Sequence, residues 1–243
     1  MAQNVYDDPE FFANYSRLDR SVRGLDGAPE WPRVQRLFPP VDGARVLDLG
    51  CGFGRICRWA AEQGASEVVG IDLSAKMLER AREETADPRV RFVRADLDEV
   101  TLADGPYRLV VSSLALHYLR DVDRLFREVA GALEPGGRFV ALLEHPIFTA
   151  PTTGQWAEVD GRSVWPLEGY SRPGPRVRDW LAPGVLKQHR PMAAYVQAIL
   201  DVGMQLVALE EWVPDAATLE AHPDWVDELE RPMFLILGAT RPG

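Results

Sequence analysis

The sequence predicts an α/β fold in which helices cover both faces of a doubly wound, mostly parallel sheet. Two observations support this prediction. Within residues 44–143, short runs of apolar or β-branched residues alternate with longer segments whose apolar residues recur at helical spacing. Three glycines at alternate positions, Gly50, Gly52 and Gly54, follow the first short run and precede a helical segment. Right-handed crossovers between parallel strands then place helices on both faces of the sheet.

The expected core elements follow one another in order along this region. Ser74 is a suitable N-cap for the second helix, and Met77 would lie on the buried stripe of that helix. The sequence LEPGG at residues 133–137 ends the third helix and turns the chain into the last core strand. The expected strands are residues 44–49, 67–71, 90–94, 107–112 and 138–143, and the expected helices are residues 55–63, 74–85 and 122–133.

Segments of a different character flank this core. Residues 9–20 predict an amphipathic helix, and residues 30–38 predict a second helix. After the core, residues 146–190 are rich in proline and glycine and lack long apolar runs, yet they contain three tryptophans, Trp156, Trp165 and Trp180. Because disordered linkers are poor in aromatic residues, we expect these residues to form an irregular cap over the sheet.

We expect the chain to form a single domain over residues 1–243. Residues 1–40 would supply lid helices, residues 41–145 the core, residues 146–190 the cap, and residues 191–243 a C-terminal helix and edge strands. This last part predicts a helix at 192–202, a helical turn at 225–229, and strands at 205–212 and 232–239 that can pair in antiparallel fashion at the sheet edge.

Composition and charge exclude several kinds of protein. The 243 residues are 46% hydrophobic and 26% charged, as in ordinary globular proteins. The two cysteines, Cys51 and Cys57, have no partner motif for a zinc site or a disulfide framework, which fits a reducing cytosol. The net charge of −10 argues against nucleic-acid binding. Neither a signal-peptide pattern nor an apolar run of bilayer length is present in the sequence, so we expect a cytoplasmic protein without membrane contact.

The glycine-rich turn predicts a ligand site. Its glycines let the backbone turn sharply and a ligand approach closely, and the following helix N-terminus offers unpaired N–H groups. Asp72 lies at the tip of the second strand, where a carboxylate can bind both ribose hydroxyls. Asp48 would repel a pyrophosphate and suits a ligand that carries an amino group and a sulfonium. The Gly-x-Gly-x-Gly spacing also departs from the dinucleotide fingerprint, which disfavours an NAD-dependent dehydrogenase.

Residues 46–54 (VLDLGCGFG) resemble the nucleotide loop of class I S-adenosylmethionine-dependent methyltransferases, of the bacterial type 11-like group. Residues 70–74 (GIDLS), 94–97 (RADL), 110–118 (VVSSLALHY) and 133–139 (LEPGGRF) are similar to later motifs of that family, in the same order and spacing. The resemblance covers roughly residues 44–143. It implies a Rossmann-like sheet of seven strands, one of them antiparallel, and S-adenosylmethionine as cofactor.

The resemblance also implies a set of cofactor contacts. Asp72 would bind the ribose, Asp96 would bind the adenine amino group, and Leu97 would pack on the adenine ring. Tyr15 and Arg20 can reach the methionine carboxylate, with a plain surface role as the alternative. The full expected set is Tyr15, Arg20, Asp48, Gly50, Cys51, Gly52, Gly54, Asp72, Leu73, Met77, Asp96, Leu97, Ser113 and His117.

Three residues at strand ends are candidates for catalysis. In methyl transfer the enzyme mainly aligns the reactants and excludes water, and a base is needed only if the nucleophile must lose a proton. His117 and the adjacent Glu144 and His145 are the candidate bases, because ligands of open α/β sheets bind beyond the carboxyl ends of the strands. As alternatives, His117 packs against the adenosyl group or caps a helix, and Glu144 bonds locally in the turn before Pro146.

The expected partner is a small-molecule methyl acceptor, bound by residues of the lid, the fourth strand end and the cap. Aromatic side chains suit an aromatic or hydrophobic acceptor, although the tryptophans could instead hold the Pro-rich cap together. The candidate acceptor-binding residues are Phe11, Tyr118, Trp156 and Trp165. No acidic cluster resembles a catechol-type magnesium site, so no metal is expected. A homodimer is the assembly to consider.

Two other functions remain as alternatives to O-, N- or C-methylation of a small molecule. Modification of tRNA or protein would require a basic rim or an added binding module. A non-catalytic S-adenosylmethionine-binding protein would be favoured by a degraded glycine loop or by loss of Asp72. The sequence shows none of these features.

Overall fold

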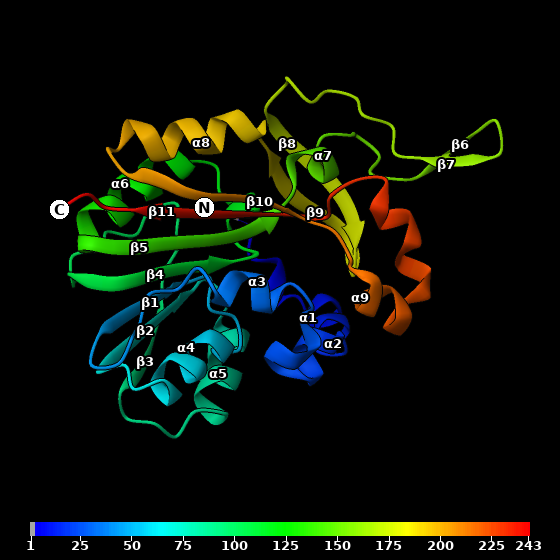
Figure 1. The fold of residues 1–243 in the computed structure, drawn as a ribbon. Coiled ribbons are helices and arrows are strands. Elements are labelled where there is room, and N and C mark those ends of the chain that lie inside the picture. The colour runs from blue at the N-terminus through cyan, green and yellow to red at the C-terminus, as the bar shows by residue number, and fades with distance from the viewer. Residues whose placement is uncertain (1–2) are drawn as a thin grey trace.

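A seven-stranded sheet forms the centre of the computed structural model, which describes residues 3–243 (Figure 1). The strand order is β10-β11-β5-β4-β1-β2-β3. Strand β11 runs antiparallel to both of its neighbours, and all other pairs are parallel. The expected mostly parallel sheet with one antiparallel strand is therefore confirmed. The strands are β1 (Arg45–Leu49), β2 (Glu67–Asp72), β3 (Val90–Arg94), β4 (Tyr107–Ser113), β5 (Leu133–Glu144), β10 (Gln205–Trp212) and β11 (Phe234–Thr240).

Helices cover both faces of this sheet (Figure 1). On one face, α6 and α8 bury Phe126 and Ile199 against the strands. On the other face, α4 and α5 bury Cys57 and Leu78. Ser74 caps α5 as expected, because its hydroxyl accepts a hydrogen bond from the Met77 amide at 3.1 Å. These helices are α4 (Arg55–Glu62), α5 (Ala75–Glu83), α6 (Val122–Ala132) and α8 (Met192–Asp201).

The N-terminal segment is more broken than the sequence pattern predicts. The single helix expected at 9–20 is two helices, because Leu18 is extended and the chain turns there. The first helix begins where the Asp8 carboxylate accepts the amides of Glu10 and Phe11, each at 2.9 Å. The segment contains η1 (Val5–Asp7), α1 (Pro9–Tyr15), α2 (Asp19–Val22), η2 (Gly24–Gly27) and α3 (Trp31–Gln35).

The cap is not irregular, which corrects the expectation for residues 146–190. It begins with a short helix, α7 (Pro146–Thr149), and continues as two antiparallel hairpins. Asp160 and Gly161 both have positive φ in the first hairpin turn, and the Asp-Gly pair is a recognisable hairpin signal in the sequence. The hairpins pair β6 (Ala157–Val159) with β7 (Arg162–Val164), and β8 (Gly174–Trp180) with β9 (Ala182–His189).

The C-terminal part contains one element beyond those expected. Helix α9 (Ala216–Ala221) begins at Asp215, whose carboxylate accepts the Thr218 amide at 2.9 Å. The helical turn expected near residue 225 is the 3-10 helix η4 (Pro223–Leu229). None of the helices formed by residues 3–243 combines the length and the apolar character needed to cross a membrane.

Candidate functional site

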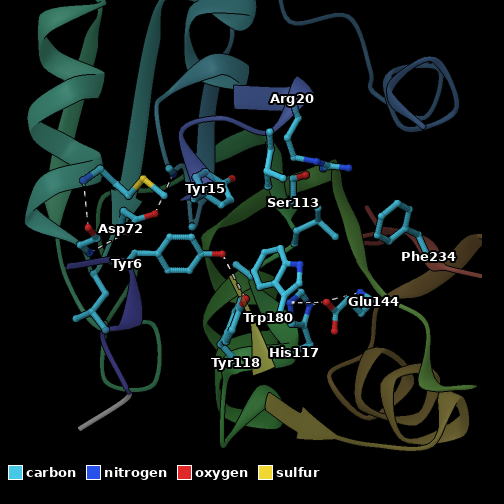
Figure 2. A pocket seen from close by; sticks show the side chains of 18 of the residues that line it. Tyr6, Tyr15, Arg20, Asp72, Ser113, His117, Tyr118, Glu144, Trp180 and Phe234 are labelled. Carbon is cyan, nitrogen blue, oxygen red and sulfur yellow. Dashed lines mark hydrogen bonds and ion pairs between the residues drawn. The ribbon is translucent and has the colours of Figure 1, made fainter. Parts of the chain in front are cut away.

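A cavity of about 420 Å³ lies beyond the carboxyl ends of β1, β2, β4 and β5. The strand tips contribute Gly52, Asp72 and Glu144 to its wall. The remaining wall comes from the core segments that follow β2, β3 and β4, and from the N-terminal segment, the cap and the C-terminal part (Figure 2). This is the position expected for a ligand site in an open α/β sheet.

The three glycines of the turn have different structural roles. A Cβ atom on Gly50 would overlap the Ala115 methyl group, and one on Gly54 would lie 2.6 Å from the Phe92 ring. Both glycines are therefore required by packing within the protein. Gly52 has φ +52°, and a Cβ atom on it would have no neighbour within 4 Å, so a side chain there would enter the cavity it lines. Only Gly52 combines a left-handed backbone with open space at the site.

Asp72 is fixed at the tip of β2 by backbone amides. Its carboxylate accepts the Gly52 amide at 2.8 Å and the Ser74 amide at 2.9 Å. Burial raises the pKa of Asp72, and these two hydrogen bonds oppose that effect by stabilising the ionised form. The side chain lines the large cavity, so a carboxylate with a fixed orientation faces the site.

A smaller cavity of about 110 Å³ adjoins the first and shares Tyr15, Arg20 and Gly52 with it. Asp48 lines this cavity and is buried. Its Oδ2 atom accepts a hydrogen bond from the Cys57 thiol at 3.4 Å, whereas its Oδ1 atom has no partner. Burial raises the pKa of Asp48 to about 7. A buried carboxylate oxygen without a donor favours a ligand that supplies one, such as an ammonium group.

Arg20 is held at the boundary of the two cavities. Its guanidinium donates to Glu30 at 3.0 Å, and the Glu30 side chain is buried. The structure thus brings Arg20 and Tyr15 to the same region as Asp48, as expected from the sequence. Cys51 lines the small cavity and Gly54 lines neither, whereas the other expected cofactor residues reach the large one: Gly50, Leu73, Met77, Asp96, Leu97, Ser113 and His117.

Aromatic side chains form the opposite end of the large cavity. Tyr118, Trp180 from β8 and Phe234 from β11 line this end, and Tyr6 extends toward it from beside Asp72, with its hydroxyl 3.3 Å from that of Tyr118 (Figure 2). Of these four, only Tyr118 is among the acceptor-binding residues expected from the sequence. Tyr6 precedes the first capped helix and has no local sequence signal, because its role depends on where the N-terminal segment docks.

His117 lies in the cavity wall as a buried, neutral side chain. Burial lowers its pKa to about 4. Its Nδ1 atom is 3.4 Å from the backbone amide of Glu144, which donates to it. A neutral imidazole that accepts at Nδ1 carries its proton on Nε2. In this tautomer Nε2 is a hydrogen-bond donor, and it lies 3.9 Å from Oε1 of Glu144.

Glu144 and His145 are adjacent in sequence but point to different environments. Glu144 lines the cavity, with Oε1 in an ion pair with Lys187 and 3.9 Å from Nε2 of His117. His145 is buried outside the cavity, where Nδ1 accepts the Ile147 amide at 3.1 Å and Nε2 lies 3.0 Å from Glu211. The two residues are adjacent in the sequence, but their side chains do not act together in the cavity. Lys187 carries no sequence signal, because its partner is 43 residues away.

The remaining candidate acceptor residues lie outside the cavity wall. Phe11 is fully buried behind it, with its ring centroid 4.7 Å from that of Tyr6. Trp156 and Trp165 pack around the Arg231 guanidinium, at 4.9 and 4.1 Å from their ring centroids. Phe11 thus supports the wall, and the two tryptophans hold the cap to the C-terminal part. Among residues 3–243, no group of three or more His, Cys, Asp or Glu side chains could hold a metal ion.

Comparisons with known proteins agree with this geometry. A family described as a methyltransferase domain matches residues 46–137. A crystal structure of an S-adenosylmethionine-dependent methyltransferase from Mesorhizobium loti is 50% identical, has a TM-score of 0.85, and covers 90% of this chain and 100% of its own. The chain belongs to the class I S-adenosylmethionine-dependent methyltransferases. Both the enzyme class and the cofactor expected from the sequence are confirmed.

Named relatives of this methyltransferase act on different substrates. A trans-aconitate 2-methyltransferase from Azoarcus sp. is 31% identical over 95% of this chain and 87% of its own length. A malonyl-[acyl-carrier protein] O-methyltransferase from Enterobacter lignolyticus is 40% identical, but the match spans only 39% of this chain and 36% of the relative. Family membership therefore establishes the cofactor and the reaction class, and the acceptor has to be argued from this chain's own cavity.

Proposed function

We propose that this methyltransferase methylates a small, aromatic or hydrophobic molecule at an oxygen, nitrogen or carbon atom. The observation that carries the proposal is the shape of the large cavity, which is walled by the strand tips, the N-terminal segment, the cap and the C-terminal part. Its acceptor end is lined by Tyr118, Trp180 and Phe234, and Tyr6 extends to it from beside Asp72. Aromatic walls of this kind bind flat or apolar ligands with little loss of conformational entropy.

The proposal includes an orientation for the cofactor. Asp72 binds the ribose hydroxyls, Asp96 the adenine amino group, and Leu73, Met77 and Leu97 pack against the adenosine. The methionine end lies toward the small cavity, where the unpartnered Oδ1 of Asp48 accepts from its ammonium group and Arg20 faces its carboxylate. The open space in front of Gly52 and the orphan oxygen of Asp48 both support this fit.

Charge favours a small molecule over tRNA as the acceptor. The chain carries a net charge of −10, whereas binding to phosphate backbones depends on clustered cationic side chains. A protein acceptor would need an open route for a side chain into the site. The N-terminal segment contacts the cap across that route, where the side-chain amide of Asn14 donates to the Leu181 carbonyl at 2.8 Å.

The test uses S-adenosylmethionine with an isotopically labelled methyl group, incubated with the enzyme and a metabolite extract. We expect the label in one or a few small molecules identified by mass spectrometry. Parallel incubations contain bulk tRNA or a protein lysate. The Asp72→Ala variant serves as the control for cofactor-dependent labelling. Label that is found only in the tRNA or protein fraction would overturn the proposal.

A further inference from the structure

We propose that the acceptor's nucleophile is a hydroxyl or amine group and that Oε2 of Glu144 accepts a hydrogen bond from it and, for a hydroxyl, also its proton. Lys187 is the positioning residue that keeps Glu144 in place. This inference rests on the proposed function and names the acceptor chemistry that the same cavity selects. Figure 2 shows Glu144 beside His117 and Trp180, on the far side of the pocket from Asp72.

The two oxygens of Glu144 are in different situations. Oε1 forms the ion pair with the Lys187 ammonium and lies 3.9 Å from Nε2 of His117. Oε2 is buried and has no hydrogen-bond partner in the protein. Because a buried carboxylate oxygen without a donor is costly, the arrangement is completed by a ligand that presents an O–H or N–H group.

Lys187 reaches Glu144 from behind the cavity wall. Its side chain is buried, and its ammonium lies 4.8 Å from the Trp180 ring centroid and 5.7 Å from that of Phe148. Both rings line the cavity, but Lys187 does not. The lysine therefore acts on the acceptor only through Glu144 and the two aromatic walls, which is the role of a positioning residue.

The surrounding charges keep Glu144 ionised. Burial raises the pKa of Glu144, but the hydrogen-bonded ammonium of Lys187 and the positive charge of Arg178 oppose this effect, and the pKa is lowered overall. Arg178 is otherwise engaged with backbone carbonyls, including that of Thr149 at 3.1 Å. Arg231 pairs with Glu228 at 2.7 Å. The titratable or charged groups that interact electrostatically with Glu144 are His117, Tyr118, Arg178, Lys187, Tyr195 and Arg231.

The step is balanced for a hydroxyl acceptor. A lone pair on its oxygen forms the bond to the methyl carbon, and the carbon–sulfur bond breaks with its electron pair remaining on sulfur. The oxygen's proton becomes strongly acidic as the new bond forms and passes to Oε2, so a carboxylate with a lowered pKa is a sufficient base. For an amine, the positive charge moves from sulfur to nitrogen and is stabilised by the carboxylate. A carboxylate acceptor would instead place two anions together.

The labelling experiment gives the first test. We expect the labelled methyl group in an ether or a methylated amine, and label in a carboxylate ester or on carbon would overturn the inference while leaving the proposed function intact. Absence of any labelled small molecule would count against the proposed function itself. The two failures are therefore distinguishable.

Variants give the second test, with the labelled acceptor as substrate. Glu144→Gln should lower kcat by about 100-fold or more and leave the affinity for S-adenosylmethionine unchanged. Lys187→Met should raise the pKa of the acid limb of kcat/KM, whereas Lys187→Arg should restore the wild-type profile. The double variant with both Glu144→Gln and Lys187→Met leaves no buried charge unpaired, and should be folded and inactive. Wild-type kcat in Glu144→Gln, or an unshifted limb in Lys187→Met, would refute the assignment.

A third measurement needs no acceptor. The infrared difference spectrum between wild type and Glu144→Gln, recorded with S-adenosylhomocysteine across pH, reports the ionisation of Glu144. We expect its pKa to be low in the wild type and higher in Lys187→Met. Equal titration of the carboxylate in both proteins would show that Lys187 does not control it.

Discussion

The two ends of the large cavity are built in different ways. The cofactor end is made of neighbouring strand tips, where Gly52 donates its amide to Asp72 at 2.8 Å and the Gly50 amide bonds to Ile71 at 2.8 Å. The proposed acceptor end is made of Tyr118, Trp180 and Phe234, which come from three distant segments. Hydrogen bonds donated by backbone amides fix the first end, and side-chain contacts between docked segments fix the second.

This difference shows which changes each end can tolerate. The cofactor end is part of the sheet, so its geometry does not depend on how the cap docks. The acceptor end depends on anchors outside the cavity, such as Arg231 among its aromatic neighbours and Arg178, which donates to carbonyls at the end of α7 and just beyond it. Changes in the cap can therefore alter the acceptor without altering the use of S-adenosylmethionine.

The largest expected effect is at the cofactor end. Asp72→Ala removes two charge-assisted hydrogen bonds to the ribose, each worth about 1.5–3 kcal/mol, so the Kd for S-adenosylmethionine should rise by on the order of 100-fold. Calorimetry on wild type and variant measures this change. Equal affinities for the two proteins would contradict the ribose assignment and remove the proposed distinction between the ends.

A pH experiment compares one buried group from each end. The pKa of His117 falls from 6.5 to about 4, so its contribution to stability is complete above the ordinary histidine value and is lost as the pH falls toward 4. The pKa of Asp48 rises from 3.8 to about 7, so its contribution is complete at low pH and is lost as the pH rises through 7. The two effects amount to roughly 3 and 4 kcal/mol, respectively.

Variants separate these two opposing dependences of stability on pH. Asp48→Asn should be more stable than wild type at neutral pH and should lose stability steeply on acidification, because the His117 slope is then unopposed. His117→Gln should lose less stability than wild type as the pH falls from neutral toward 4, because the contribution of His117 is removed. Urea unfolding across pH measures both slopes. A pH dependence identical to wild type in either variant would show that the burial of that group does not govern its titration.

A glycine comparison sharpens the assignment of the cofactor end. Gly52→Ala should weaken S-adenosylmethionine binding by about tenfold or more, because the new methyl group enters the cavity. Gly43→Ala is the matched control, since Gly43 also has positive φ and open space but lies outside both cavities. Both variants should lose about 1–2 kcal/mol of stability from left-handed backbone strain. Weakened binding in the control as well would point to strain rather than contact with the cofactor.

Two tryptophan variants sharpen the assignment of the acceptor end. Trp180→Ala should raise the acceptor KM several-fold, a loss of about 1 kcal/mol, with cofactor affinity unchanged. Trp165→Ala should instead lower the melting temperature and leave KM unchanged, because it removes the contact with Arg231 and the stacking on Phe148. Steady-state kinetics and thermal unfolding distinguish the two. The reverse pattern would place Trp165 in the acceptor site.

The smallest expected effect is that of a chelator. EDTA should leave the rate of methyl transfer unchanged, because no group of three or more His, Cys, Asp or Glu side chains in residues 3–243 could hold a metal ion. Initial rates with and without EDTA measure this. Activity that is lost with EDTA and restored by magnesium would show a metal requirement.

The sequence predicts most of the core and only part of the site. Strands at 67–71, 90–94 and 205–212 agree closely with β2, β3 and β10, because strand patterns and turn residues act over a few neighbouring positions. The two cap hairpins are not predicted, because their strands are short and only one turn carries a recognisable Asp-Gly pair.

Local sequence is enough to specify the ligand-facing turn, since Gly52 follows β1, Asp72 ends the neighbouring strand β2, and the Gly52 amide donates to the Asp72 carboxylate. The packing of distant elements is needed to make Glu144 face the cavity while His145 is buried against Glu211. The same packing brings Lys187 to Glu144, because β9 lies against the end of the sheet. The physical reason is the separation along the chain of the residues that interact. Backbone conformation in strands and turns depends on residues close in the chain, whereas contacts between distant side chains depend on how separate elements dock.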